Sequence, residues 1–407
     1  MTKKNNPNVN LAIVFLVSFL VINLFLIFGP RDGEFINVEH LLHDETGVFD
    51  VSRIYFKTLF IEKDIYSSVW DESYNNYGIN NPKIAKYIIG FFDYLTNSRI
   101  IPQQKVMPLR FLLSFLSAGC VLFFYVLALK IYSPKIAYIS VFLLLINPIF
   151  KSIQYTLNGL IPMFFFSLIS LILFYDLYAK FQKKIIPLGK IILSGIFVGL
   201  AIGSKLYALS LVLFFIFLLL TLKKISLPVR ASIFLFFCIF LFFIFYISNP
   251  SLYGSAFKGI KQMTVDQVVT GVDGSRRPIM DFANYLLIYP IQLIRVKPYP
   301  ILGVEPIYQG NIFLLVINYL IIYSGFRFWW ENIKKKNRFL LLFFLSNIIF
   351  TSLYLITFSF RNTYYSPMAY VYILLTTSII LFVSPFILDI ISRLYDKCKK
   401  YKCFPLK

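Results

Sequence analysis

Long apolar runs separated by shorter polar segments recur along most of the chain. The first run, residues 11–29, has Asn23 as its one strongly polar residue. A helix of that length crosses the hydrocarbon core of a bilayer, which is about 30 Å thick. No small-residue cleavage site follows the run, so we predict a retained first membrane helix and not a signal peptide.

Nine further runs have the length of a membrane helix or nearly so. They cover residues 111–130, 136–153, 159–178, 188–203, 206–222, 229–248, 312–330, 339–358 and 367–388. Two of them, 136–153 and 188–203, are short for a full crossing and contain Pro148 or several glycines. The pattern predicts an all-α polytopic membrane protein of about ten transmembrane helices, forming a single domain over residues 1–407 with no appended soluble domain.

Composition and charge agree with this prediction. The chain is 58% hydrophobic and 14% charged, with a mean hydropathy of +0.73 and a net charge of +21. With the predicted spans alternating in direction, Lys and Arg gather in the short segments on the same side of the membrane as the N-terminus and in the tail 389–407, so both termini are expected in the cytoplasm. The basic excess therefore needs no nucleic acid to explain it, and "CKKYKC" in the tail favours a membrane-surface anchor over a zinc site.

Two long loops, residues 30–110 and 249–311, lie on the predicted outer face, where we expect the function to reside. The first loop is acidic and holds both histidines, His40 and His43. Within it, "VFDVSRIYFKTLFIEK" and "PKIAKYIIGFFDYL" carry apolar residues at helical spacing. They predict two amphipathic helices lying on the membrane surface, with Pro82 in the first turn of the second.

Five segments follow one another in a fixed order: an acidic pair in "HDETGVFDVSRIYFK", then "NNPKIAKYIIG", "GLAIGSKLYALSL", "SNPSLYGSAFKGIKQM" and "FRNTYYSPMAY". In this order they resemble segments of the GT-C membrane glycosyltransferases, above all the protein O-mannosyltransferases and the bacterial aminoarabinose transferases of lipid A. The sequence departs from that pattern at Lys83, where a second proline is usual, at Asn81, which replaces a histidine, and at Asn158, which replaces an aspartate.

The resemblance implies transfer of a sugar from a polyprenyl-phosphate-linked donor to an acceptor hydroxyl on the extracytoplasmic face, with inversion. It places the catalytic base at Asp44, with Glu45 as a supporting acid or metal contact. A solvated loop is the plain alternative for both residues. A second acidic pair, Asp71 and Glu72, is a rival base that lies very close to the Pro turn.

Four cations are candidates to hold the donor phosphate. Lys205 interrupts an apolar sequence between two spans, where an ammonium is costly unless an anion accompanies it. Lys83 and Lys86 lie at the start of the second amphipathic helix, where unpaired backbone N–H groups also favour an anion. Arg361 lies near the outer end of the ninth span, and its planar donor fork suits a phosphate. The alternatives are snorkelling to the interface for Lys205 and lipid headgroup anchoring for the other lysines.

Cofactors and rival functions stay open at this stage. His40 and Asp44 are four residues apart and could share a helical face toward a divalent metal ion, but no third ligand is fixed. A transporter or lipid flippase is the first rival, which the absence of internal repeats and of charge within the spans disfavours. An oligosaccharide polymerase or ligase, which would rely on 249–311, or a membrane scaffold is the second.

The expected partners are a polyprenyl-phosphate sugar, an acceptor protein or glycolipid, and membrane lipids. The Ile, Lys, Asn, Tyr and Phe bias favours an AT-rich bacterial genome, and hence the inner (plasma) membrane and a role in the cell envelope. The sequence specifies neither the sugar nor the acceptor.

Overall fold

A computed structural model describes residues 7–28, 51–64, 83–95, 106–154, 160–253, 312–332, 338–357 and 366–400. Within these ranges the secondary structure is helical and no β-strand occurs, as predicted for an all-α protein. The α-helices are α1 (Pro7–Phe28), α3 (Ile84–Leu95), α4 (Val106–Ile131), α5 (Pro134–Ile146), α6 (Pro148–Ile153), α7 (Leu160–Gln182), α8 (Leu188–Ser204), α9 (Ser210–Leu220), α10 (Leu227–Ile247), α14 (Ile312–Asn332), α15 (Arg338–Thr357) and α16 (Ser366–Lys400). Single turns of π- or 3-10 helix are η3 (Lys57–Ile61), η6 (Leu206–Leu209) and η7 (Pro250–Leu252), and residues 51–56 are α-helical and lead into η3.

Several of these helices are built to cross a membrane. Among the described residues, four are long and apolar enough, namely Phe111–Ile131, Leu160–Gln182, Leu227–Ile247 and Ile373–Lys397. Five shorter apolar helices accompany them, within Asn10–Leu24, Pro134–Ile146, Leu188–Ser204, Leu206–Leu220 and Arg338–Leu353. The predicted apolar runs thus lie on helices, while their total of ten crossings stays a prediction.

The predicted span 136–153 is divided into two helices, α5 and α6. The break falls at Asn147 and Pro148, where the fixed φ and missing N–H of proline favour a helix start. The Asn147 side-chain oxygen accepts hydrogen bonds from the N–H groups of Ile149 and Phe150, at 3.0 and 3.2 Å, and so caps α6. The single crossing expected for this run is therefore not a single helix.

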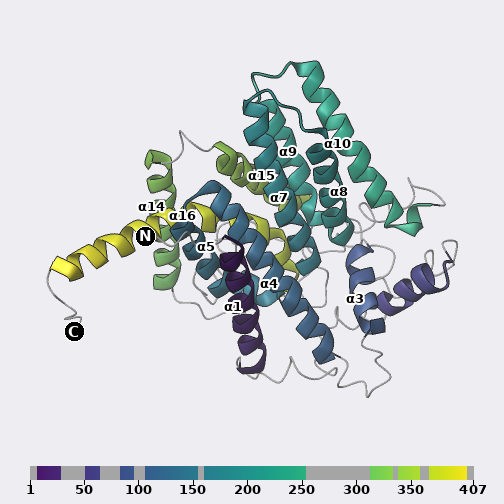
Figure 1. Cartoon of the computed structure of the whole chain (residues 1–407), viewed down its shortest axis with the longest axis horizontal. Coiled ribbons are helices and arrows are strands. Elements are labelled where there is room, and N and C mark those ends of the chain that lie inside the picture. Colours follow the sequence, from purple (N-terminus) through teal and green to yellow (C-terminus); the bar gives the residue numbers. More distant parts are fainter. Residues whose placement is uncertain are drawn as a thin grey trace.

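The helices form two groups that share one apolar core. The first group is α7, α8, α9 and α10, and the second is α1, α4, α5, α6, α14, α15 and α16. Figure 1 shows α7, α8, α9 and α10 side by side, while α4 lies next to α7, α1 lies next to α4, and α16 crosses between α5, α14 and α15. The groups meet where α4 packs on α7 and where α15 packs on α9. Aromatic rings fill the centre of the first group: Phe215 lies 5.0 Å from Phe174 and 4.3 Å from Phe237, between ring centroids.

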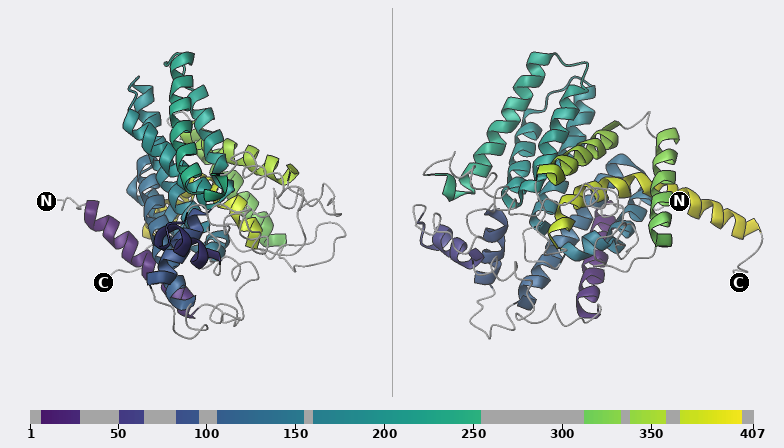
Figure 2. Two further views of the ribbon diagram at one scale, coloured as in Figure 1. Left: turned by 90° about the vertical axis from the view of Figure 1, so that its right-hand side faces the viewer. Right: turned by 180° about the vertical axis from the view of Figure 1, so that it is seen from behind.

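Two views confirm that the outer face of α10 has few protein neighbours (Figure 2). Leu235, Phe242 and Phe243 on this helix are all more than half exposed. In water such an apolar surface would be unfavourable, whereas in a bilayer it faces lipid. Polar groups inside the apolar helices also join neighbouring helices: the Ser114 hydroxyl donates to Asn23 Oδ1 at 3.1 Å, joining α4 to α1.

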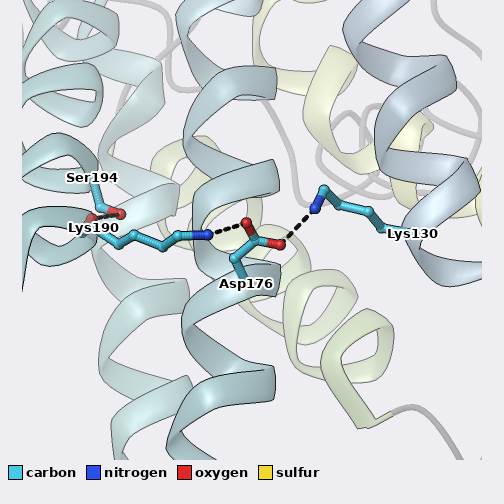
Figure 3. A network of polar contacts seen from close by, with 4 residues as sticks. All are labelled: Lys130, Asp176, Lys190 and Ser194. Carbon is cyan, nitrogen blue, oxygen red and sulfur yellow. Dashed lines mark hydrogen bonds and ion pairs between the residues drawn. The ribbon is translucent and has the colours of Figure 1, made fainter. Parts of the chain in front are cut away.

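A polar network joins three helices at the N-terminal end of α8 (Figure 3). Asp176 of α7 accepts from Lys130 Nζ of α4 at 2.6 Å and, through its other oxygen, from Lys190 Nζ of α8. The Ser194 hydroxyl, one turn on, donates to the Lys190 carbonyl oxygen at 2.7 Å. These groups are partly buried, so the network holds α4, α7 and α8 in register more than it adds to net stability.

A stripe of glycines lets α8 approach its neighbours closely. A Cβ atom at Gly195 would lie 2.6 Å from the carbonyl oxygen of Phe237, and one at Gly199 would lie 2.8 Å from that of Leu241, both in α10. Small residues four apart allow helix backbones to pack this closely within membranes. At Gly203 the nearest atom belongs to Ile84, 2.7 Å away, so the same stripe also admits α3.

We predict that Gly195→Ala destabilises the protein by about 1–3 kcal/mol, because the added methyl group meets backbone that cannot move aside. Thermal unfolding of the purified protein in detergent measures the effect. The matched control is Gly189→Ala in the same helix, where a Cβ atom would meet nothing within 4 Å. If both variants unfold at the wild-type temperature, the proposed role of the glycine stripe in the close packing of α8 on α10 is contradicted.

Candidate functional site

The helix α3 lies against the end of α8 opposite the Asp176 network (Figure 1). It also contacts α4 and α7, so it is part of the bundle and is not confined to its surface. Its amphipathic character is as predicted. The polar residues Lys86 and Asp93 are buried, whereas Phe91 and Tyr94 are exposed. The helix α3 thus turns these two charged residues inward and an aromatic side outward, and its position on the membrane surface stays a prediction.

The segment 51–61 packs along α3 at very short range. A Cβ atom at Gly90 would lie 2.2 Å from the carbonyl oxygen of Ser52, so only glycine permits this contact. Arg53 Nε lies 3.6 Å from Asp93 Oδ2 and joins the two helices by an ion pair. The predicted apolar face of this segment is confirmed where it is described, because Val51 and Tyr55 pack with Tyr87 of α3 in a small core.

A residue from the far side of the sequence fixes the start of α3. Asn249, directly after α10, accepts a hydrogen bond from the backbone N–H of Lys83 at 3.2 Å. Its amide nitrogen donates to the carbonyl oxygen of Phe245 at 2.6 Å and to the Ser248 hydroxyl at 3.0 Å, so the end of α10 holds the side chain in place. Asn249 is fully buried, and it supplies an acceptor for one of the N–H groups that a helix start leaves without a partner.

Two buried lysines converge on one aromatic ring. The side chains of Lys83 and Lys86 are 0% and 3% exposed. Their Nζ atoms lie 4.6 and 5.3 Å from the centroid of the Tyr55 ring, within the range of cation–π attraction. Lys83 Nζ also donates to the Tyr55 hydroxyl at 3.4 Å. The Tyr55 ring thus holds the two amines close to each other at the start of α3.

Lys205 completes a cluster of three cations, which we call the lysine cluster (Lys83, Lys86 and Lys205). It is the residue that ends α8, two positions after Gly203, and it is half-buried. Burial lowers the pKa of Lys83 to about 7. The pKa of Lys86 lies well below its ordinary value, first because of burial and then because of the charges of Lys83 and Lys205. This region of the protein is therefore strongly disposed to accept negative charge.

Tyr87 of α3 packs near Tyr55, over whose ring the two buried lysines lie. Burial raises the pKa of Tyr87, and its neighbours Tyr253 and Tyr55 raise it further, so its hydroxyl keeps its proton. Within the described residues, the buried Tyr87 hydroxyl oxygen has no hydrogen-bond partner. Buried polar groups are rarely left so, and a bound ligand is one way to satisfy them.

Three of the candidate residues are thus brought together from segments far apart in the sequence. Lys83 and Lys86 begin α3, and Lys205 lies between α8 and η6. The alternative that Lys83 and Lys86 bind lipid headgroups is excluded, because neither side chain reaches the surface. The remaining candidates lie outside the described residues: Asp44, Glu45, Arg361, the rival pair Asp71 and Glu72, His40, His43, Pro82 and Asn158.

Sequence reasoning missed Tyr55 and Asn249 as parts of this site. Tyr55 appeared only as one apolar position of an amphipathic segment, and its spacing from Val51 gave no sign of a cation contact. Asn249 is the second residue of the segment "SNPSLYG", and the motif gave this asparagine no role. Among the described residues no group of three His, Cys, Asp or Glu side chains is placed to hold a metal ion.

Comparison with known proteins gives the fold. No family model matches the chain, and no curated protein is detectably similar to it in sequence. Solved structures do match: the archaeal oligosaccharyltransferase AglB from Archaeoglobus fulgidus, in complex with an inhibitory peptide and a dolichol-phosphate, has a TM-score of 0.53 at 13% identity. ArnT from Cupriavidus metallidurans, bound to undecaprenyl phosphate, has a TM-score of 0.54 at 13% identity.

These matches extend over nearly all of the chain. The AglB structure covers 98% of it and the ArnT structure 92%, whereas the chain covers only 52% and 59% of those proteins. The chain thus spans a little over half the length of either. Both are GT-C membrane glycosyltransferases, so the GT-C fold expected from the order of the sequence segments is confirmed.

We predict that Asn249→Ala loosens the start of α3, because the buried N–H of Lys83 loses its acceptor, at a cost of about 1–3 kcal/mol. Hydrogen exchange at the amides of the first turn of α3 should become faster. Asn332→Ala is the control, since that exposed side chain donates to the carbonyl oxygen of Phe328 four residues before it, within its own helix. Equal exchange in wild type and Asn249→Ala would contradict the anchoring role of Asn249.

Proposed function

We propose that the protein is an inverting glycosyltransferase. It moves a sugar from a polyprenyl-phosphate carrier to an acceptor hydroxyl at the extracytoplasmic membrane face. The fold supports the general kind of reaction, since proteins of the same fold are described as an oligosaccharyltransferase and as ArnT and were solved with dolichol-phosphate or undecaprenyl phosphate. A shared fold does not by itself fix a reaction, so the proposal depends on the site.

The lysine cluster is the observation that carries the proposal. A leaving polyprenyl phosphate carries negative charge that grows as the bond to the sugar breaks. Cations fixed beforehand in a water-poor site stabilise such charge far more than they would in water. Lys83 and Lys86 are buried and held over Tyr55, and Lys205 reaches the same region from α8. Arg361 is proposed as a further phosphate contact, as expected from the sequence.

The reaction we propose has a single chemical step. Asp44 takes the proton of the acceptor hydroxyl, whose oxygen attacks the anomeric carbon from the face opposite the phosphate. The bond between that carbon and the phosphate oxygen breaks, and its electron pair leaves with the polyprenyl phosphate toward the lysine cluster. One carboxylate base acting in line inverts the configuration. Glu45 would support Asp44, as an acid or as a contact for a divalent metal ion.

A transporter or flippase, and a polymerase or ligase, would handle the same carrier lipid and could use the same cations. They differ from the proposed enzyme in what Asp44 does. A flippase forms no glycosidic bond, and a ligase that relies on residues 249–311 would not depend on a base in the first outer loop. The following test therefore separates the three functions.

We predict that Asp44→Asn lowers transfer at least about 100-fold, the usual contribution of a positioned general base. Mass spectrometry of surface glycans and glycolipids is the measurement, comparing a deletion strain that carries the wild-type gene with one that carries the variant. Asp71→Asn, which alters the rival acidic pair, is the matched control and should restore the wild-type pattern.

Binding of polyprenyl phosphate to purified Asp44→Asn should stay near that of the wild type, because the base does not hold the phosphate. Full product formation by Asp44→Asn would refute the assignment of the base. If Asp71→Asn loses the product and Asp44→Asn does not, the catalytic base belongs to the second acidic pair, Asp71 and Glu72.

We also predict that the affinity for polyprenyl phosphate falls as pH rises from 7 to 9. The pKa of Lys83 is depressed to about 7 in the free protein, so above this pH the amine is neutral and must take up a proton to pair with phosphate. Each proton taken up weakens binding by up to about tenfold per pH unit. Over this range the phosphate is already fully ionised, because its second pKa is about 6.

Measurements of the dissociation constant for polyprenyl phosphate at several pH values between 7 and 9 test the prediction. Lys83→Gln should bind more weakly at pH 7 and show a shallower pH dependence. Lys183→Gln is the control, since this exposed lysine lies in the turn after α7, at the other end of α8. Unchanged affinity and slope in Lys83→Gln would remove this lysine from the phosphate site.

A further inference from the structure

The last helix, α16, continues well beyond the part that is buried in the bundle. Its residues 373–385 are buried, residues 386–389 are half-buried and residues 390–397 are exposed. The change coincides with Pro385, the proline inside this helix. From there the helix leaves the body of the molecule toward the C-terminus (Figures 1 and 2).

The exit of α16 is fixed by hydrogen bonds from neighbouring helices. Pro385 has no N–H group, so the carbonyl oxygen of Leu381 lacks its usual helical donor. The hydroxyl of Tyr132, in the turn between α4 and α5, donates to that oxygen at 2.9 Å. One residue before the proline, the hydroxyls of Ser384 and Ser140 are 2.8 Å apart and bonded to each other. The bundle thus holds the helix at the point where it departs, which sets the direction of the extension.

The extension, residues 386–400, is amphipathic in its own right. Apolar side chains recur at three- and four-residue spacing along one side and are increasingly exposed toward its end: Ile387, Ile390, Ile391, Leu394 and Tyr395. The opposite side is charged, and there Arg393 Nε pairs with Asp389 Oδ2 at 2.9 Å. The segment contains four Lys or Arg against two Asp, so it carries a net positive charge.

The extension also runs in the direction expected of a helix lying in a membrane surface. In Figure 1 the extension runs across the direction of α10, and Figure 2 shows the same from behind. The helix α10 is one of the described helices that are long and apolar enough to cross a membrane, so a helix set across it runs along the plane of the bilayer. Residues 373–397 of α16 also have that length and composition, but the course of the helix across α10 favours an interfacial position for its exposed part.

We propose that residues 386–400 form an interfacial helix that binds an anionic lipid surface. Its apolar stripe enters the boundary between headgroups and acyl chains, and Arg393 and Lys397 remain at headgroup level, where each basic residue is attracted to anionic lipid. This occupant is favoured over a second copy of the chain because the segment 386–400 carries a net positive charge, so two copies would repel one another. The sequence predicted a basic surface anchor in this tail, and the structure identifies the side that enters the lipid.

The full chain in lipid nanodiscs provides the test. In a background with all four cysteines replaced by serine, a single cysteine at Leu394 or at Asp396 carries an environment-sensitive fluorophore. The first position is on the apolar stripe and the second on the charged side. Nanodiscs contain phosphatidylcholine alone or with phosphatidylglycerol, and quenching by iodide is compared with quenching by a spin-labelled lipid. Ile391 and Ser392 serve as a second pair of positions.

With phosphatidylglycerol present, the Leu394 label should be quenched by lipid and be several-fold less sensitive to iodide than the Asp396 label. The double variant Arg393→Gln, Lys397→Gln should lose at least about tenfold in its preference for anionic lipid, from two basic residues. Equal iodide quenching at both positions in anionic nanodiscs would overturn the proposal. So would protection of Leu394 that persists in detergent and grows with protein concentration, because a second copy would then cover the stripe.

Discussion

The burial of two lysine side chains over one tyrosine ring is the constraint on which the rest of the site depends. Removing an ammonium group from water costs several kcal/mol unless charge or hydrogen bonds compensate, and here two lie against Tyr55 with a third nearby. A chain retains such an arrangement only if the surrounding structure enforces it. Three features do so: the glycine stripe of α8 admits α3, Gly90 admits the segment 51–61, and Asn249 holds the first turn of α3.

These features also explain how segments far apart in the sequence come to serve one site. The C-terminal ends of α8 and α10 both meet the start of α3, since Gly203 contacts Ile84 while Asn249 binds Lys83. At the opposite end of α8, the Asp176 network fixes the same helix against α4 and α7. The position of α8 is thus set at both ends, and Lys205 is delivered to Lys86 as a consequence.

Hydropathy along the sequence was sufficient for the helices, because apolar runs of this length have few other stable arrangements. The amphipathic period also gave α3 and the segment around Tyr55, and an ammonium in an apolar stretch singled out Lys205. The period could not tell which side of α3 faces the bundle, since in a membrane protein an aromatic side can face lipid while Lys86 and Asp93 face inward. Nor could it reveal that Asn249 binds Lys83, a contact across 166 positions that only the packing of α8 on α10 creates.

The central claim is that the lysine cluster receives the phosphate of a polyprenyl carrier. A cryo-electron microscopy map of the protein with bound polyprenyl phosphate tests it most directly. The account predicts phosphate density within hydrogen-bonding reach of the amines of Lys83, Lys86 or Lys205, beside the Tyr87 hydroxyl. Phosphate density held elsewhere on the protein, with the lysine cluster unchanged from the free state, would contradict it.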